Sequence, residues 1–492
     1  MTPQEEHRYQ KAALNSRRHF LRTCTLGLGG MTLSGMLGCD TAVGSQVSPV
    51  TGVGESLRGA LSLAPRARRV IYLHMAGAPS QLELFDHKPK LRELHGKDCP
   101  ESLLEGKKFA FIRGTPKLLG AQAEFAQRGK SGQWVSDLLP HFSKVVDEVA
   151  FLKAVHTEEF NHAPAQLLMQ TGHNQPGRPS MGAWVTYGLG SENENLPGFI
   201  VLGSGGRDPS AGKKLWGSGF LPSIHQGIQC RTAGDPILYL SNPEGMSRDL
   251  RGQSIEAINA LNQRQYAEVG DPETLTRIKQ YEMAFKMQVS VPEVMDITKE
   301  PPAMHELYGT DPGKTTFANN CLMARRLAEA DVRFIQLYDW GWDTHGTSTS
   351  DNLEDQLRLK CREIDQGMSA LLLDLKQRGL LEDTLVVWGG EFGRTPMQEN
   401  RGGLAKPFLG RDHHGEAFTM WLAGGGVRPG ITYGETDELG YGGVAGRVHV
   451  HDVHATLLAA LGVDHERLTY GFQGRDFRLT DVHGRVIEDI MS

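Results

Sequence analysis

The sequence predicts an α/β fold in which a mostly parallel central sheet is flanked by helices, with an insertion in the middle of the chain. Two observations support this prediction. From residue 68 onward, short apolar runs alternate with amphipathic stretches, which is typical of parallel strands joined by helices. Between residues 203 and 310 this alternation gives way to polar loops and one charged helical stretch, 247–288. A chain of 492 residues is long enough to bury a large core without disulfides.

The expected elements follow from the spacing of apolar residues. Strands are predicted at 70–73, 149–152, 199–202, 332–337, 384–388 and 418–422, and helices at 163–170, 181–187, 315–330, 353–378 and 453–461, the last with Asp452 as its N-cap. We expect one domain over 68–492. The insertion at about 203–310 would either help to shape a substrate cleft or serve as a structural cap.

The N-terminus resembles an export leader. Arg17 and Arg18 are followed by Phe20, Leu21 and a glycine-rich apolar stretch at 25–37 that is too short to span a membrane comfortably. Residues 1–39 therefore predict recognition by the twin-arginine export machinery and a location in the periplasm or cell envelope. Met36-Leu37-Gly38-Cys39 resembles the end of a lipoprotein leader. If Cys39 is lipidated, the protein would lie on a membrane surface; without the lipid no membrane contact is expected. Residues 40–67 are expected to form a flexible linker.

Composition excludes some classes of function. The formal net charge of −6 provides no broad positive field, so nucleic acid is not an expected partner. Six scattered cysteines do not form a disulfide framework. The 19 histidines are more informative, because several stand in short clusters beside acidic residues, as in metal sites and acid–base sites.

Polar side chains gather at the ends of the predicted strands. In open parallel sheets, ligands bind beyond the carboxyl ends of the strands, so these residues are the candidates for chemistry. They are Glu83 and Asp86 after the first strand, Thr157 and His162 after the second, Asp343 and His345 after 332–337, Glu391 and Arg394 after 384–388, and His413 just before 418–422.

A mixed oxygen and nitrogen metal site is predicted from Asp343, His345, Glu391 and His413. Carboxylates and imidazoles are ligands for divalent ions such as Zn, Mn, Mg or Ca, whose identity the sequence leaves open. Asp412 or His414 would support these ligands from behind. Each residue also has an ordinary structural interpretation: the Asp-x-His pair as a cap or surface pair, and Glu391 as support for a turn. Arg394 would either clamp an anionic group or neutralise Glu391.

Four stretches, at 75–80, 341–345, 389–395 and 410–414, resemble the family called domain of unknown function 1501, which is similar to alkaline phosphatases and sulfatases. The segment His162-Ala163-Pro164-Ala165-Gln166 resembles the sulfatase segment Cys/Ser-x-Pro-Ser-Arg. This resemblance implies that His162 stands where sulfatases carry the formylglycine precursor. Because no cysteine is present at that position, ordinary sulfatase chemistry is not expected.

Two further segments are similar to metal-binding segments of the superfamily. Glu391-Phe392-Gly393 resembles Asp-His-Gly, and Asp412-His413 resembles the Asp-His-Thr of phosphopentomutase-like members, which favours His413 over His414 as a ligand. The acidic ligand that the superfamily carries after its first strand has no direct counterpart. The resemblance therefore implies that Glu83 or Asp86 replaces it.

The leading functional hypothesis is hydrolysis or transfer of a phosphate or sulfate ester, on a small molecule or a glycan, at one or two divalent metal ions. Arg394 or His162 would stabilise developing charge, and His162 or Thr157 would be the nucleophile of any covalent step. His162 could instead act as a general acid, a metal ligand or a helix cap. The rival hypothesis is a surface-anchored binding protein, for example for glycans, on the same fold. An oxidoreductase is disfavoured because no Gly-x-Gly-x-x-Gly links a strand to a helix.

Overall fold

The computed structural model describes residues 60–61, 63–237, 242, 244–401 and 407–492, which belong to one compact unit, Val53–Ser492. The leader at 1–39, including Cys39, and the linker up to residue 59 lie outside the described residues. Export and lipidation therefore stay predictions. The described end of the linker packs on the domain, because the backbone N–H groups of Arg66 and Ala67 both donate to the carbonyl oxygen of Ala460 at 2.8 Å.

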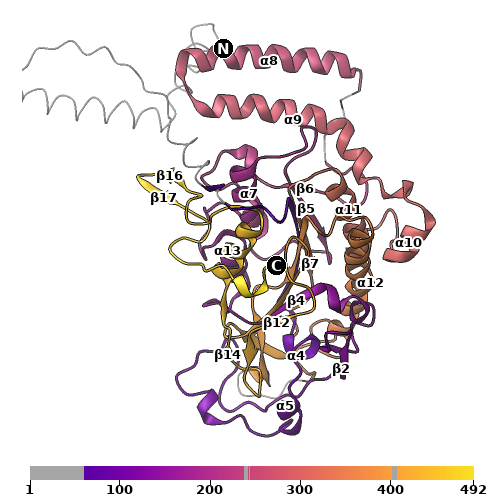
Figure 1. Cartoon of the computed structure of the whole chain (residues 1–492), viewed down its shortest axis with the longest axis vertical. Helices are drawn as coiled ribbons and strands as arrows, with labels where there is room; N and C mark the ends of the chain where they lie inside the picture. Colours follow the sequence, from indigo (N-terminus) through magenta and orange to yellow (C-terminus); the bar gives the residue numbers. More distant parts are fainter. Residues whose placement is uncertain (1–59, 62, 238–241, 243, 402–406) are drawn as a thin grey trace, which may run out of the picture. The chain divides into compact units, whose positions relative to one another are not determined.

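All of the predicted strands are present in one central sheet (Figure 1). They are β1 (Arg69–Ala76), β4 (Val149–His156), β5 (Phe199–Ser204), β7 (Phe334–Trp340), β8 (Thr384–Gly389) and β11 (Phe418–Ala423). Three short strands complete the sheet: β6 (Ile228–Cys230), β12 (Thr432–Tyr433) and β15 (Val448–His449). The order is β12-β4-β11-β8-β1-β7-β5-β6, with β15 also beside β4.

The directions of the strands bring the predicted site residues to one edge. β1 runs parallel to β7 and β8, and β5 runs parallel to β7 and β6. β11 is antiparallel to both β8 and β4, so β4 points the same way as β1. The carboxyl ends of β1, β4, β5, β7 and β8 therefore meet at the edge where β11 begins. The mostly parallel sheet predicted from the sequence is confirmed.

Helices cover both faces of the sheet, which explains why its strands are apolar throughout. Alternate residues of β1 point to opposite faces. Ile71 and Leu73 pack with α11 (Phe317–Glu329) and α12 (Gln356–Gln377). Val70 and Tyr72 pack with the other layer, made of α6 (His162–Thr171), α7 (Met181–Leu189) and α13 (Val450–Ala460). α13 begins one turn earlier than predicted: its N-cap is His449, and Asp452 closes the capping box at the third helical position.

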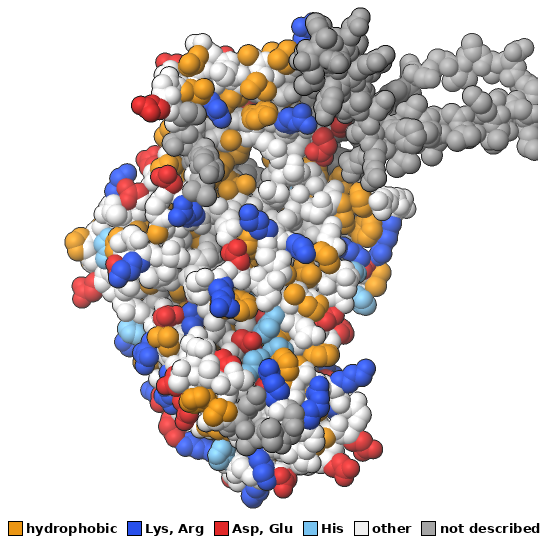
Figure 2. Space-filling view, turned by 180° about the vertical axis from the view of Figure 1, so that it is seen from behind, with side chains coloured by type: hydrophobic (Ala, Val, Ile, Leu, Met, Phe, Trp, Pro, Cys, Tyr) orange, Lys and Arg blue, Asp and Glu red, His pale blue; other side chains and the backbone are white. Residues whose placement is uncertain are grey.

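The mid-chain segment contains a pair of long helices, α8 (Arg248–Val269) and α9 (Pro272–Met295), followed by α10 (Pro302–Tyr308). The single charged stretch expected at 247–288 is thus two helices lying side by side (Figure 1). Gly270, at φ 69°, ends α8, and the Asp271 side chain caps α9 by accepting from the N–H of Glu273. Hydrophobic side chains gather on the surface of this pair (Figure 2): Leu250, Ile258, Leu261, Leu275, Tyr281 and Val289 are exposed.

Smaller elements join these layers. They are α4 (Gln81–Leu84), α5 (Pro89–Glu93), the strand pairs β2 (Phe125–Arg128) with β3 (Gln133–Ser136), β9 (Gly393–Gln398) with β10 (Arg411–His414), β13 (Glu435–Thr436) with β14 (Gly443–Ala445), and β16 (Tyr470–Phe472) with β17 (Arg475–Phe477). Among the described residues, every helix is too short or too polar to cross a lipid bilayer.

Candidate metal centre

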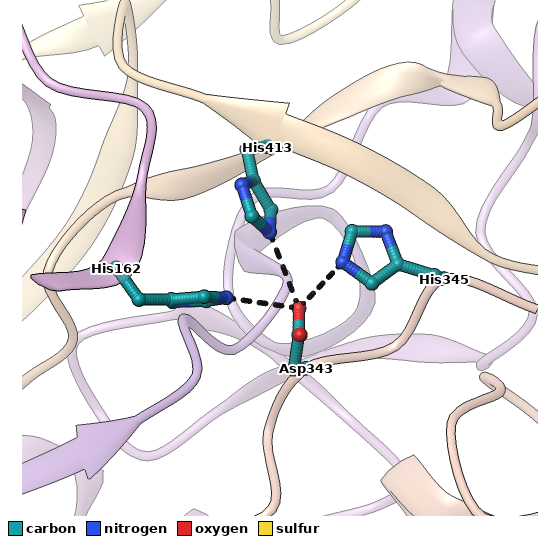
Figure 3. Close-up of side chains that lie close together, drawn as sticks. All are labelled: His162, Asp343, His345 and His413. Carbon is teal, nitrogen blue, oxygen red and sulfur yellow. Dashed lines mark hydrogen bonds and ion pairs between the residues drawn. The ribbon is translucent and has the colours of Figure 1, made fainter. Parts of the chain in front are cut away.

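Four side chains converge at the shared edge of the sheet (Figure 3). His162 is the first residue of α6, Asp343 and His345 follow β7, and His413 lies in β10. The Nε2 atoms of the three histidines lie 3.2, 2.8 and 3.3 Å from the same oxygen, Oδ1 of Asp343. The four donor atoms all lie within 4.8 Å of one another. Three segments far apart in the sequence therefore form one candidate metal-binding cluster.

The close approach of two loops positions Asp343. The turn after β1 passes against the backbone of the segment after β7, and Gly77 at φ +112° makes the contact. A Cβ atom at Gly77 would stand 2.7 Å from the backbone nitrogen of Asp343, so only glycine fits. This approach also lets the backbone N–H of Gly77 donate to Glu391 at 3.0 Å.

The other ring nitrogen of each histidine is held by an acceptor of the protein. His162 Nδ1 donates to Oε1 of Glu391 at 2.7 Å, and His413 Nδ1 donates to the carbonyl oxygen of Phe160 at 2.7 Å. His345 Nδ1 donates to the carboxylate of Glu399. Because each Nδ1 carries the donated proton, each Nε2 atom faces Asp343 and could offer its lone pair to a cation when the ring is neutral. Acceptors behind the ligating histidines fix this tautomer in protein metal sites.

Charge around Asp343 keeps its carboxylate ionised. Burial alone would raise the pKa of Asp343, but the Arg394 guanidinium at 2.6 Å and the three imidazoles outweigh it and hold that pKa well below its usual range. Burial likewise opposes a charge on His162, yet the contacts with Asp343 and Glu391 raise its pKa to about 9. For His413 burial dominates and lowers the pKa to about 4.

The donor set fits a divalent ion. In a tetrahedral site with ligand bonds near 2.0 to 2.1 Å, neighbouring donors stand about 3.3 Å apart, close to the three separations from Asp343 Oδ1. His162 Nε2 is buried, and its close polar contact is the Asp343 carboxylate at 3.2 Å. The Asp343 side chain is 30% exposed, so the centre reaches solvent on one side.

Glu391 and Arg394 lie beside the cluster and hold it in place. Glu391 is fully buried, and its Oε1 accepts from Gln166 Nε2 at 2.9 Å as well as from His162. Arg394 is equally buried: Nε donates to the carbonyl oxygen of Ala78, and Nη2 donates to Asp343. The structure therefore places Glu391 behind His162 and outside the four-residue cluster, and the Arg394 guanidinium donates to protein acceptors.

The remaining sequence candidates lie apart from the cluster. Glu83 forms a buried ion pair with Arg411 at 2.7 Å. Asp86 accepts from the Thr436 hydroxyl, and Thr157 Oγ1 accepts from the N–H of Glu159 at 3.3 Å. None of Glu83, Asp86 and Thr157 belongs to a metal-sized group of the described residues.

Sequence reasoning missed two of the three groups that accept the ring protons. Glu399 and the Phe160 carbonyl carry no recognisable signal, since only the fold brings them to His345 and His413. Glu399 also groups with His345 and Asp412 at metal-ligand distances. The Asp412 carboxylate, however, accepts from three backbone N–H groups, those of residues 111, 112 and 413, which marks it as an anchor for these segments.

Comparison with known proteins identifies the family. A family model described as "Protein of unknown function (DUF1501)" matches residues 67–491, so the chain belongs to that family, as the sequence predicts. Among curated proteins there is no match.

Similar solved structures include sulfatases and phosphatases. The PsFucS1 sulfatase from Pseudoalteromonas sp. shares 11% identity at a TM-score of 0.35, over 85% of this chain and 73% of that chain. The alkaline phosphatase from the Antarctic bacterium TAB5 shares 11% identity at a TM-score of 0.32, over 74% and 94%. The lipoteichoic acid synthase LtaP from Listeria monocytogenes shares 10% identity at a TM-score of 0.35, over 86% and 80%.

Proposed function

We propose that the chain is an exported metal-dependent hydrolase of phosphate or sulfate esters, with its metal held by His162, Asp343, His345 and His413. The observation that carries this proposal is the convergence of three Nε2 atoms on one carboxylate oxygen, with each Nδ1 held by an acceptor. A structural ion pair would need only one histidine. Three largely buried rings around one oxygen suit a shared cation.

A divalent ion bound there would act as a Lewis acid toward water and an ester oxygen. The chain's own residues hold the ligands in position: Glu391 and Glu399 retain the ring protons, and Arg394 adds a fixed positive charge beside Asp343. Both nitrogens of His162 are engaged within the centre, which favours a ligand over a nucleophile. We therefore assign the attack on the ester to water.

The donor types favour zinc, or manganese, over calcium and magnesium. Three imidazoles and one carboxylate match the borderline ions that accept nitrogen, whereas Ca and Mg sites are built mainly of oxygen ligands. Export rests on residues 1–39, with their paired arginines Arg17 and Arg18.

The test combines metal content with turnover. The purified protein is analysed by elemental mass spectrometry and assayed with aryl phosphate and aryl sulfate esters, beside His413→Ala and the matched control His414→Ala. The two histidines are adjacent and similarly buried, but His414 Nε2 donates to the Tyr441 carbonyl instead of facing Asp343. We expect one equivalent of metal and turnover in the wild type and the control, and loss of both in folded His413→Ala.

Two results would contradict the proposal. Absence of metal from the wild type after reconstitution with Zn, Mn, Mg and Ca would remove the centre itself. If the metal-loaded protein hydrolyses none of the esters, the proposed catalytic activity is wrong. A binding protein for anions or glycans on the same fold would then be favoured.

A further inference from the structure

We infer that the centre continues into a second subsite, beyond the carboxyl ends of β5 and β6, that binds an anionic group on a neighbouring sugar ring of the substrate. This inference rests on the proposed function and specifies its substrate class: carbohydrate esters that carry more than one tetrahedral oxyanion. Three features carry it, namely a pair of cavities, unpaired arginines that line them, and Trp340, whose ring lies beside the metal centre and whose backbone contacts a cavity-lining residue.

Two adjoining cavities lie at this part of the sheet edge. One, of about 370 Å³, is lined by residues that include Arg207, Asp208, Gln229, Arg231 and Thr232. The other, also about 370 Å³, shares Ser204, Gly206 and Thr315 with the first and extends to Asp339 and Arg362. Each lies within the range of roughly 300 to 1,000 Å³ that small-molecule sites occupy.

The first cavity carries a net positive charge, because Arg207 and Arg231 line it together with a single acid, Asp208. The guanidinium groups of Arg207, Arg231 and Arg362 line the cavities, and no described residue forms an ion pair or hydrogen bond with them. Asp208 accepts from the neutral Gln229 amide at 3.2 Å and keeps its charge, whereas Asp339 and Glu363 in the second cavity both pair with Lys360, Asp339 at 2.8 Å. Two unpaired arginines at the first cavity and a third at the second favour a ligand with oxyanion groups.

Trp340 connects the cavities to the metal centre. Its half-buried ring lies 6.4 Å from the His162 ring, centroid to centroid. On its other side, the cavity residue Gly205 packs on the Trp340 backbone so tightly that a Cβ atom would come within 2.3 Å of the carbonyl oxygen. The same loop is tied to the centre at Ala211, whose N–H donates to Gln166, the residue that donates to Glu391.

These features together specify the ligand. A half-buried indole beside the metal centre suits the flat apolar face of a sugar ring, while the arginines of the cavities suit an anionic substituent. The N-terminal end of α11 borders the second cavity through Phe317 and Ala318, and its dipole adds to the preference for an anion. A substrate would thus place one ester at the metal centre, lay a ring on Trp340, and place a second oxyanion among the arginines.

The test compares defined ligands on the full-length protein by isothermal titration calorimetry. The probes are a disaccharide sulfated on both rings and the same disaccharide sulfated on one ring, with the corresponding phosphates as a second arm. We expect the doubly sulfated or doubly phosphorylated probe to bind more tightly than its single counterpart. Arg207→Gln with Arg231→Gln should reduce that preference by at least about tenfold, since the second oxyanion loses two charge-assisted contacts.

The matched control is Arg264→Gln, which removes the same charge from an exposed, unpaired arginine on α8. It should leave the preference unchanged. Equal affinity for the single and double probes, or an undiminished preference in the double variant, would overturn the inference.

Repeating the titration on Asp343→Ala measures binding at the arginines without an intact metal centre. This variant lacks a proposed metal ligand but keeps the arginines. If the protein holds no metal and yet binds the double probe through Arg207 and Arg231, the hydrolase proposal fails and the subsite stands. If ester turnover is normal and the double variant behaves as wild type, the subsite alone fails.

Discussion

Substituting Glu391 by glutamine tests the support of the metal centre most directly. Glu391 is fully buried, and its Oε1 accepts from His162 Nδ1, Gln166 and the N–H of Gly77, while its Oε2 lies 3.3 Å from Nε2 of His74. The Glu391→Gln side chain has the same shape but no charge, and half of its terminal group is a donor. His162 then loses the carboxylate that fixes its tautomer.

The expected effect is a loss of metal affinity with retention of the fold. Replacing the acceptor behind a ligating histidine lowers affinity by roughly 10- to 100-fold, or about 1.4 to 2.7 kcal/mol. Affinity is measured by competition with a chromophoric chelator, and the fold by circular dichroism. If folded Glu391→Gln binds metal within about twofold of wild type, His162 is not held as a ligand in the way we describe.

Glu83→Gln provides the matched control. Glu83 is also a fully buried carboxylate at this end of the molecule, but it pairs with Arg411 instead of a histidine of the cluster. This substitution should lower the free energy of unfolding, because Arg411 is left buried without a full counter-charge, while metal affinity changes little. A large loss of metal affinity in folded Glu83→Gln would instead restore Glu83 as a ligand candidate.

Two further predictions concern stability. Arg325 is almost fully buried and contacts Glu300 at 2.6 Å and Asp374 at 3.0 Å, so Arg325→Met should lower the free energy of unfolding in urea by about 3 to 5 kcal/mol. Arg378→Met removes a half-exposed partner of the same Asp374 and should cost about 1 kcal/mol or less; equal losses would contradict this reasoning. Burial lowers the pKa of His454 from its usual value to about 3. Between about pH 6.5 and about pH 3, the imidazole is therefore protonated in the unfolded chain but not in the folded protein. The free energy of unfolding that is present above about pH 6.5 falls as the pH is lowered through this window. Wild type should lose about 2.5 kcal/mol more than His454→Gln between about pH 7 and about pH 4.5, and parallel pH profiles would refute this assignment.

The core of the sheet could be predicted because its strands are buried on both faces. Each interior strand is a run of apolar residues, and such runs are visible without knowledge of their neighbours. The direction of β11 carries no such signal, since its pairing with β8 and β4 depends on where the preceding loop returns the chain. The break between α8 and α9 had a local signal: Gly270 followed by Asp271 and Pro272 matches a helix end and a new helix start.

The site shows a sharper division between ligands and their supports. His162, Asp343, His345 and His413 could be proposed from sequence because each follows or precedes a strand at the edge where parallel sheets bind ligands. Two of the three supports do not share that property. Glu399 reaches His345 from the end of a hairpin, and Phe160 acts only through its backbone. Glu391 looked like a ligand because a carboxylate after a strand and a carboxylate behind a histidine are identical in sequence. They differ only in whether a ring stands between the oxygen and the centre, and this is the difference that Glu391→Gln measures.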